Sequence, residues 1–326
     1  MGNLQYLNFK GPFAEFVKDF IQYKQSLGYK YDSETKMLRL FCEFTENYSI
    51  EECDLSKELI EAWFSNMNDV SAKTLELRRS TIKLFAQYMQ RMGYTAYIVP
   101  KIKITSNNNF IPYIFTHQEI ISILTTCDKM QYEWRSRHTQ LLMPTILRLL
   151  YSCGLRVSEA LNLKVKDVDL VNGILTLHQT KSDRDRYVPL SNSTLDFMKA
   201  YFFELHPNYK DNDLFFCKRD GSGFTTSTIH HYFKRVLWRS GISYGGKGKG
   251  PRLHDLRHTF SVHSLSRWVE EGKDIYCILP ILASYLGHSD IRATERYLRL
   301  TAEVFPDMIS SIEKCCSSTI PEVNAL

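Results

Sequence analysis

The sequence contains no cysteine pair with metal-site or redox spacing, although it has eight cysteines in 326 residues. No C-x-x-C pair occurs, which excludes zinc ribbons and thioredoxin-like motifs. It also has no long apolar run. The longest uncharged apolar stretch, residues 276–289, contains Pro280 and is shorter than the roughly 20 residues that a spanning helix needs. The first residues mix charges with apolar side chains, unlike a secretory signal. We therefore expect a cytoplasmic protein without a membrane anchor.

The chain also lacks a strong excess of positive or negative charge. The chain has 41 Lys and Arg against 36 Asp and Glu, a net charge of +5, which permits a nucleic-acid partner without requiring one. The contents of 44% hydrophobic and 24% charged residues are typical of soluble globular domains and exclude long disorder and fibrous repeats. At about 150 residues per domain, the length predicts two domains.

Strand signals are nearly absent from the first part of the chain. Apolar residues at helical spacing predict four helices between residues 10 and 94, and Gly28 and Gly93 mark two of the ends. A polar stretch containing three consecutive asparagines and Pro112 then predicts a linker. We expect a helical domain at residues 1–105, a linker at 106–112 and a second domain at 113–326.

The second part mixes helices with one strand pair. Thr116 and Glu119 form a capping box that opens a helix. An apolar helix over 141–151 is closed by Gly154, and a new helix is expected over 156–161. Residues 174–179 and 186–190 then predict two strands around a polar turn, before helices return from about 195. The fold class is therefore mainly α with a small antiparallel β-sheet (α+β).

Three short strings could carry chemistry. In the first, His254 and Arg257 stand three residues apart and would share a helix face, where an imidazole and a guanidinium suit a phosphate. In the second, Arg156 follows Gly154, and Glu159 is close enough to brace the guanidinium. Taken alone, each string is equally typical of a solvated helix face or a surface ion pair.

The third string is Leu286-Gly287-His288, followed nine residues after the histidine by Tyr297. A lone tyrosine usually serves packing, and this chain has 19 of them. Tyr276 and Tyr285 precede His288, and we expect both in a helix core. Taken together and in this order, the strings resemble the tyrosine recombinase, or phage integrase, family. The resemblance covers residues 140–300, and the residues that carry it are Arg156, Lys181, His254, Arg257, His288 and Tyr297.

The resemblance implies a site-specific DNA recombinase that needs no cofactor or metal. Tyr297 would attack a phosphodiester and form a 3′-phosphotyrosine, and covalent catalysis retains the bond energy. Arg156 and Arg257 would stabilise the charge that accumulates on the phosphate oxygens. Replacing either arginine by alanine is then expected to abolish most activity while leaving folding largely intact.

The other roles are implied in the same way. His254 would take the tyrosine proton or share in phosphate binding, and His288 would hydrogen-bond the phosphate. Lys181 would donate a proton to the leaving 5′-oxygen, although its turn is also what any exposed hairpin tip looks like. Glu159 would orient Arg156 or its neighbours without contacting the phosphate itself.

The family also implies that the two domains close around double-stranded DNA as a clamp. Basic side chains would contact the backbone, or else form solvated helix faces. The candidates are Lys73, Arg78, Arg79, Lys83, Lys234, Arg235, Lys247 and Lys249. We expect a monomer in solution and a homotetramer on two DNA sites, with accessory factors or sister recombinases as further possible partners. An amphipathic stretch over residues 304–312 would pack on a neighbouring protomer or fold back on its own domain.

Other functions remain open. A mobile-element integrase or transposase is favoured over an Xer-like resolvase of chromosome or plasmid dimers. A type IB topoisomerase fits the pattern less well. A non-catalytic DNA-binding accessory protein would not need every catalytic position filled. A nucleotide-binding enzyme would rest on the Gly-rich loop at 241–248, which is one residue short of a phosphate-binding loop and lacks its final Ser or Thr.

Overall fold

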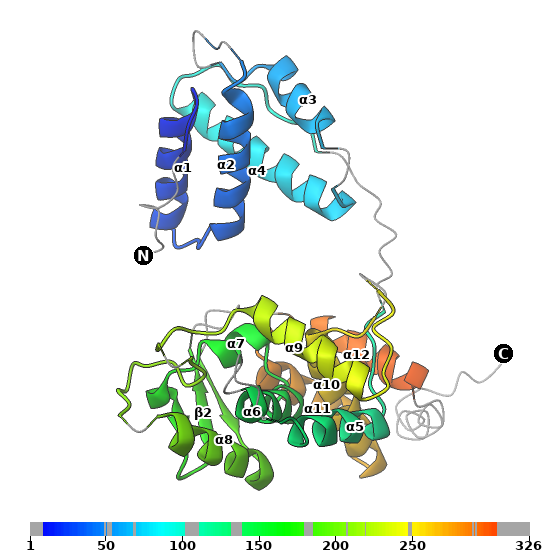
Figure 1. Ribbon diagram of the computed structural model, residues 1–326. Coiled ribbons are helices and arrows are strands. Elements are labelled where there is room, and N and C mark those ends of the chain that lie inside the picture. Colours follow the sequence, from blue (N-terminus) through cyan, green and yellow to red (C-terminus); the bar gives the residue numbers. More distant parts are fainter. Residues whose placement is uncertain are drawn as a thin grey trace, which may run out of the picture. The chain divides into compact units, whose positions relative to one another are not determined.

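The structure is a computed structural model that describes residues 9–48, 50, 54–67, 70–101, 111–131, 139–178, 185–206, 208–218, 220–246, 250–288, 290 and 292–304. The chain divides into two units, Met1–Phe110 and Ile111–Leu326, each with its own core (Figure 1). The predicted linker at 106–112 falls mainly outside the described residues. No helix among the described ranges is both long and apolar enough to cross a membrane.

The first unit contains the four helices that the apolar spacing predicted. They are α1 (Ala14–Ser26), α2 (Asp32–Thr45), α3 (Lys57–Ser65) and α4 (Ala72–Arg91). Ser56 and Ser71 begin α3 and α4, because each hydroxyl accepts a backbone N–H of the first turn. The helices enclose a core of large aromatic rings, which includes Phe13, Phe20, Phe41, Trp63 and Phe85.

The second unit is built from eight α-helices in its described part. These are α5 (His117–Asp128), α6 (Thr139–Ser152), α7 (Val157–Leu161), α8 (Asn192–Leu205), α9 (Thr226–Arg239), α10 (Leu253–Glu270), α11 (Ile275–Leu286) and α12 (Arg292–Val304). The capping box predicted for Thr116 and Glu119 is present: the Glu119 carboxylate accepts the Thr116 N–H at 2.8 Å. The buried α6 packs against α5, α8, α9 and α10 and forms the centre of the unit (Figure 1).

The predicted strand pair is present, and a third strand precedes it. The sheet has the order β1 (Val168–Asp169), β2 (Ile174–Leu177) and β3 (Arg186–Pro189), and both pairings are antiparallel. The register places Leu177 opposite Arg186. β1 was not predicted, because two residues are too few to show alternation. The turn that carries Lys181, residues 179–184, lies outside the described residues.

The C-terminal half of the second unit positions the candidate site. α10 packs against α6, α11 and α12, and α11 and α12 contact each other. Their contacts form a separate apolar cluster that contains Leu282, Leu286 and Tyr297. One prediction was wrong: Tyr276, at the start of α11, is 72% exposed and does not belong to the core. Tyr285, at the other end of α11, is partly buried as expected.

Candidate active site

A sharp backbone turn between α6 and α7 begins the site. Gly154 has φ of +59°, and a Cβ at this position would come within 2.4 Å of Phe260. Glycine is therefore required on both counts. The turn directs the carbonyl oxygen of Gly154 toward α10, where it accepts a hydrogen bond from Nη1 of Arg257 at 2.7 Å. It also places Arg156 at the start of α7.

Glu159 on α7 is the centre of a cluster of guanidinium groups. Its Oε1 accepts a hydrogen bond from Arg156 Nη1 at 2.6 Å, and its Oε2 accepts one from Arg186 Nη2 at 2.8 Å. Arg257 Nη1 lies 3.8 Å from the same Oε2. Burial alone would raise the pKa of Glu159, but the hydrogen bonds and charges of Arg186 and Arg156 outweigh it and lower the pKa. Three positive charges thus surround one carboxylate, which leaves an excess of positive charge for an anion.

Two backbone carbonyl groups hold the Arg257 guanidinium in place. Its side chain is 1% exposed and donates to the Gly154 carbonyl and, through Nη2 at 2.6 Å, to the carbonyl of Leu286 at the end of α11. Burial lowers the pKa of Arg257 to about 10, and the nearby charge of Arg156 contributes to that shift, so the group still carries its proton at neutral pH. A buried charge with this many fixed partners is positioned rather than mobile.

His254 stands one turn before Arg257, on the first turn of α10. Its side chain is exposed, whereas that of Arg257 is buried. Crowding by protein atoms, followed by the charges of Arg257 and Arg252, lowers the pKa of His254 to about 4. The imidazole is therefore neutral at physiological pH and can either donate or accept a hydrogen bond.

His288 follows α11 directly. Gly287 ends that helix with φ of +67°, and a Cβ there would meet Nη1 of Arg186 at 2.7 Å. The Gly287 carbonyl lies 3.5 Å from Nη2 of Arg156. His288 Nδ1 is 2.7 Å from Oγ1 of Thr294 on α12. Burial, followed by the charge of Arg257, lowers the pKa of His288 to about 4.

Tyr297 lies on α12, with 3% of its surface exposed. Its ring stacks beside that of His288, with centroids 6.2 Å apart. Its hydroxyl is 3.0 Å from Nδ1 of His258. The phenol is also close enough to Arg257 for its ionised form to raise the arginine pKa. One site of the second unit thus brings together the described candidates Arg156, Glu159, His254, Arg257, His288 and Tyr297, whereas Lys181 falls outside the described residues.

Two residues of the site were missed by sequence reasoning. Arg186 at the start of β3 joins the hairpin to Glu159 and to Gly287. His258, the residue after Arg257, contacts the Tyr297 hydroxyl. His258 could have been found, because it stands four residues after His254 and so shares its helix face. Arg186 carried no local signal, since its partners come from distant elements.

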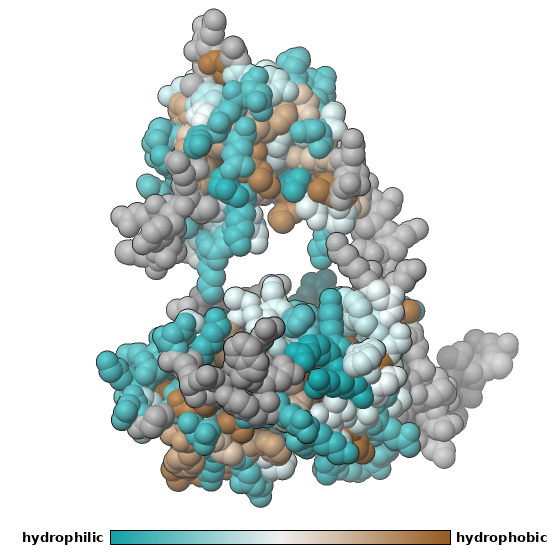
Figure 2. Space-filling view, viewed as in Figure 1, coloured by the Kyte–Doolittle hydropathy of each residue, from teal (hydrophilic) through white to brown (hydrophobic). Residues whose placement is uncertain are grey.

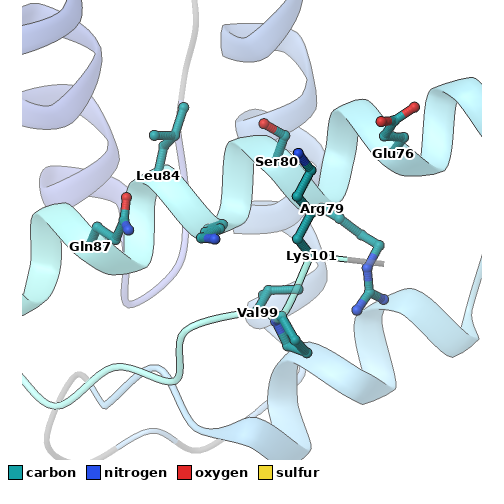
Figure 3. A pocket seen from close by; sticks show the side chains of 9 residues that line it. Glu76, Arg79, Ser80, Leu84, Gln87, Val99 and Lys101 are labelled. Carbon is teal, nitrogen blue, oxygen red and sulfur yellow. The ribbon is translucent and has the colours of Figure 1, made fainter. Parts of the chain in front are cut away.

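The basic residues expected to contact DNA fall into two groups. On α4 of the first unit, Arg79 and Lys83 line a pocket of about 410 Å³ together with Lys101 (Figure 3). The Arg79 guanidinium lies 4.8 Å from the Phe64 ring, and its buried Nε has no hydrogen-bond partner among the described residues. Lys73 and Arg78 are on the same helix outside the pocket.

In the second unit, α9 carries Lys234 and Arg235. Lys234 is exposed and lies 4.3 Å over the ring of Tyr244. Hydrophilic side chains follow α9 on the displayed face of this unit (Figure 2). Lys247 and Lys249, the other two candidates here, lie outside the described residues. Within the described ranges, no group of three or more His, Cys, Asp or Glu side chains could hold a metal ion.

Known proteins share both the sequence pattern and the fold. The protein y4rB of Sinorhizobium fredii, which has the provisional name integrase/recombinase, is 27% identical over 93% of this chain and 97% of its own. Tyrosine recombinase XerD of Staphylococcus saprophyticus is 26% identical over 79% of this chain and 80% of its own. The Tn1549 transposon integrase, solved with transposon right end DNA, has a TM-score of 0.60 at 16% identity and covers 89% of this chain and 99% of that one.

The family model agrees with the motifs. Residues 114–303, more than half of the chain and including every described site residue, match the phage integrase family. The structure adds a mostly helical fold with a three-stranded antiparallel sheet, in which the matching motifs meet. The chain therefore belongs to the phage integrase family and is a tyrosine recombinase, an enzyme that breaks and rejoins DNA strands.

Proposed function

We propose that this recombinase acts at specific DNA sites and cuts one strand at a time with Tyr297. The phenolic oxygen attacks a phosphodiester, giving a 3′-phosphotyrosine and a free 5′-hydroxyl. The observation that carries the proposal is the cluster of Arg156, Arg186 and Arg257 around Glu159, with Tyr297 beside it. No cofactor is needed, because the covalent bond to tyrosine retains the energy for rejoining.

The arginines stabilise the transition state by charge. Negative charge accumulates on the non-bridging oxygens as the phosphorus becomes five-coordinate, and preorganised donors aimed at it lower the barrier. Arg156 and Arg257 supply these donors. Glu159 neutralises part of the positive charge and fixes the direction of Arg156 through two hydrogen bonds, one to the guanidinium and one to the backbone N–H.

The remaining groups handle protons and orientation. His254 and His288 face the same region in their neutral forms, and each can hydrogen-bond a phosphate oxygen. His288 is steadied by Thr294, which lies on the helix of the nucleophile. Lys181 remains the proposed donor of a proton to the leaving 5′-oxygen, because an ammonium releases a proton far more readily than a guanidinium.

Contacts to the DNA backbone position the site. We place them on the α4 cations Lys73, Arg78, Arg79 and Lys83 and on the second-unit cations Lys234, Arg235, Lys247 and Lys249. The two units would close around the duplex as a clamp. Lysine and arginine contacts to phosphates give affinity that falls steeply with salt, and base contacts add the sequence preference.

Recombination joins two duplexes, so we propose a monomer in solution that forms a homotetramer on paired sites. The stretch 304–312 is the proposed link to a neighbouring protomer. Accessory factors or a sister recombinase complete the set of candidate partners. The reaction takes place where the DNA is, which we propose to be the cytoplasm.

A mobile-element integrase is the preferred biological role. It is supported by the similarity to y4rB along nearly the whole of both chains and by the likeness to the transposon integrase. The similarity to XerD favours a resolvase of chromosome or plasmid dimers as the second candidate. The DNA that flanks the gene distinguishes them: attachment repeats on both sides support the integrase, and their absence supports the resolvase.

Covalent capture tests the chemistry without knowledge of the target site. The full-length protein is incubated with a library of nicked duplexes of random sequence, and protein–DNA adducts are isolated and sequenced. We expect adducts that share a sequence and are linked through Tyr297. Tyr297→Phe should bind the selected duplex but form no adduct. Adducts that persist in this variant would show that Tyr297 is not the nucleophile.

A further inference from the structure

The nucleophile is hydrogen-bonded to a histidine, and it is not the histidine that the motif singled out. The Tyr297 hydroxyl lies 3.0 Å from Nδ1 of His258, and within the described residues it has no other hydrogen-bond partner. His254 contacts the His258 ring edge-on at 4.7 Å between centroids, and the His258 ring lies 5.6 Å from the ring of Tyr297. We propose that His258, rather than His254, accepts the proton of Tyr297 when the strand is cut.

The placement of His258 follows from helix geometry. It is one turn beyond His254 on α10, and α10 packs directly against α12, the helix of Tyr297. His254 lies on the first turn of α10, where its side chain is exposed. His258 is partly buried at the contact of the two helices. Tyr297 is only 3% exposed, and its hydroxyl contacts the imidazole of His258, which lies at the same helix contact.

The protonation state suits an acceptor. Burial, followed by the charges of His254, Arg296, Arg252 and Arg257, lowers the pKa of His258 to about 3, so the ring is neutral before DNA binds. In the tautomer with the proton on Nε2, Nδ1 has a lone pair that faces the phenolic O–H. In that tautomer the phenol is the donor of the hydrogen bond. A bound phosphate would offset the same positive charges and raise the proton affinity of His258 at the time of attack.

The proposed step balances as follows, and it rests on the function proposed above. The proton of the Tyr297 hydroxyl moves to His258 Nδ1, which becomes an imidazolium, while the phenolic oxygen forms a bond to phosphorus. The bond from phosphorus to the 5′-oxygen breaks, and that oxygen takes a proton from a separate donor. In rejoining, the 5′-hydroxyl attacks phosphorus and returns its proton to that separate group, the bond from phosphorus to the phenolic oxygen breaks, and the departing phenolate recovers its proton from His258. His254 is then left to bind the phosphate.

The first test separates accepting a proton from holding the hydroxyl. Asparagine can present its side-chain oxygen close to the place of Nδ1, and so keeps the hydrogen bond, but it does not take up a proton at neutral pH. Single-turnover adduct formation is measured on the nicked duplex selected from the library. We expect both His258→Ala and His258→Asn to be slower than the wild type by about 10²–10⁴-fold, the usual range for a general base. An Asn variant within threefold of the wild type would overturn the proposal.

A second test uses chemical rescue. Imidazoles of graded pKa are added to His258→Ala and to His254→Ala. Rescue of His258→Ala should increase with the basicity of the imidazole, and His254→Ala should show no such dependence. The opposite result would assign the proton to His254. Gel-shift binding and thermal melting of each variant establish that the comparison is made on folded, DNA-bound protein.

A third test excludes a role at the leaving group. In a duplex with sulfur in place of the bridging 5′-oxygen, the leaving thiolate needs no proton. The defect of His258→Ala should persist on this substrate, and its disappearance would overturn the proposal.

Tyr297→Phe separates a failure of the proposed function from a failure of the proposed role of His258. If it still forms adducts, the proposed nucleophile is wrong, and if it is inactive while His258→Ala is fully active, only the role of His258 is wrong.

Discussion

The two units solve the problem of burying polar side chains in opposite ways. In the described part of the first unit, the buried polar side chains are Thr35, Thr45 and Thr81, and each donates to a backbone carbonyl three or four residues earlier. Its ion pairs, such as Lys18 with Glu15, lie on helix surfaces within one turn. Exposed pairs of this kind contribute about 0–1 kcal/mol. The first unit is therefore held mainly by its aromatic core.

The second unit buries charge. Arg257 and Asp255 are 1% and 0% exposed, and the side chains of Glu159 and Arg186 are each 10% exposed. All ten histidines of the chain also lie in this unit. Burying charge is costly unless every group is paired, so such clusters usually mark functional sites rather than sources of stability. This contrast indicates that the second unit carries the catalytic groups, and the contrast can be tested in three ways.

The largest effect is expected from the buried arginine. Arg257→Ala and Arg156→Ala should each slow adduct formation by at least about 10²–10³-fold, because each removes a donor to the transition state. Their effects on stability should differ. Arg257→Ala also leaves the Gly154 and Leu286 carbonyls unpaired in the core and should cost roughly 3 kcal/mol, whereas the Arg156 side chain is 21% exposed and its loss should cost less.

The sequence alone predicted that both variants would fold normally, and for Arg257 the structure argues otherwise. Urea unfolding of the two variants and of Arg257→Lys provides the measurement. Lysine keeps the charge but cannot reach both carbonyls with a planar fork. If Arg257→Ala were as stable as the wild type, the distinction between a buried structural charge and a surface charge would fail.

Acid should affect the second unit more than the first. The pKa values of His254, His263 and His288 are lowered to about 4, and that of His258 to about 3, in each case mainly because protein atoms displace water around the ring. A lowered histidine pKa means that the unfolded chain binds more protons. Stability is therefore complete above the unfolded value of about 6.5 and is lost as the pH falls toward the folded values.

Hydrogen exchange followed peptide by peptide at pH 7 and pH 5 measures this effect. After allowance for partial solvent screening, we expect the second unit to lose at least about 2 kcal/mol over that range. The first unit, which contains no histidine, should lose less than about 0.5 kcal/mol. His263→Asn, which leaves the proposed catalytic groups intact, should reduce the loss in the second unit. Equal losses in both units would contradict the assignment of the acid response to these histidines.

The comparison also explains what the sequence could predict. The four helices of the first unit follow from apolar spacing and serine caps, which are local signals. The Thr116 capping box and the hairpin strands follow in the same way. Arg156, Arg257, His288 and Tyr297 were singled out by the resemblance of their strings, taken together and in order, to the family. Arg186 was not, because its role depends on Glu159 and Gly287, which are distant in the sequence. Interactions between such distant positions leave no spacing to detect.

The smallest effect is expected at the first-unit pocket, whose basic side chains line a surface pocket instead of a buried cluster. Arg79→Ala, Lys83→Ala and Lys101→Ala should each weaken DNA binding, and the removal of one bound phosphate should flatten the slope of log affinity against log salt by about 0.9. The cleavage rate at saturating protein should stay unchanged, since no group of the catalytic site is altered. Lys57→Ala is the matched control, because Lys57 belongs to the same unit but pairs with Glu61 on α3. Gel shifts at several salt concentrations distinguish the outcomes. If the Lys57 variant lowers affinity and slope as much as the pocket variants do, the first unit attracts DNA through its total charge, and the pocket has no special part in binding.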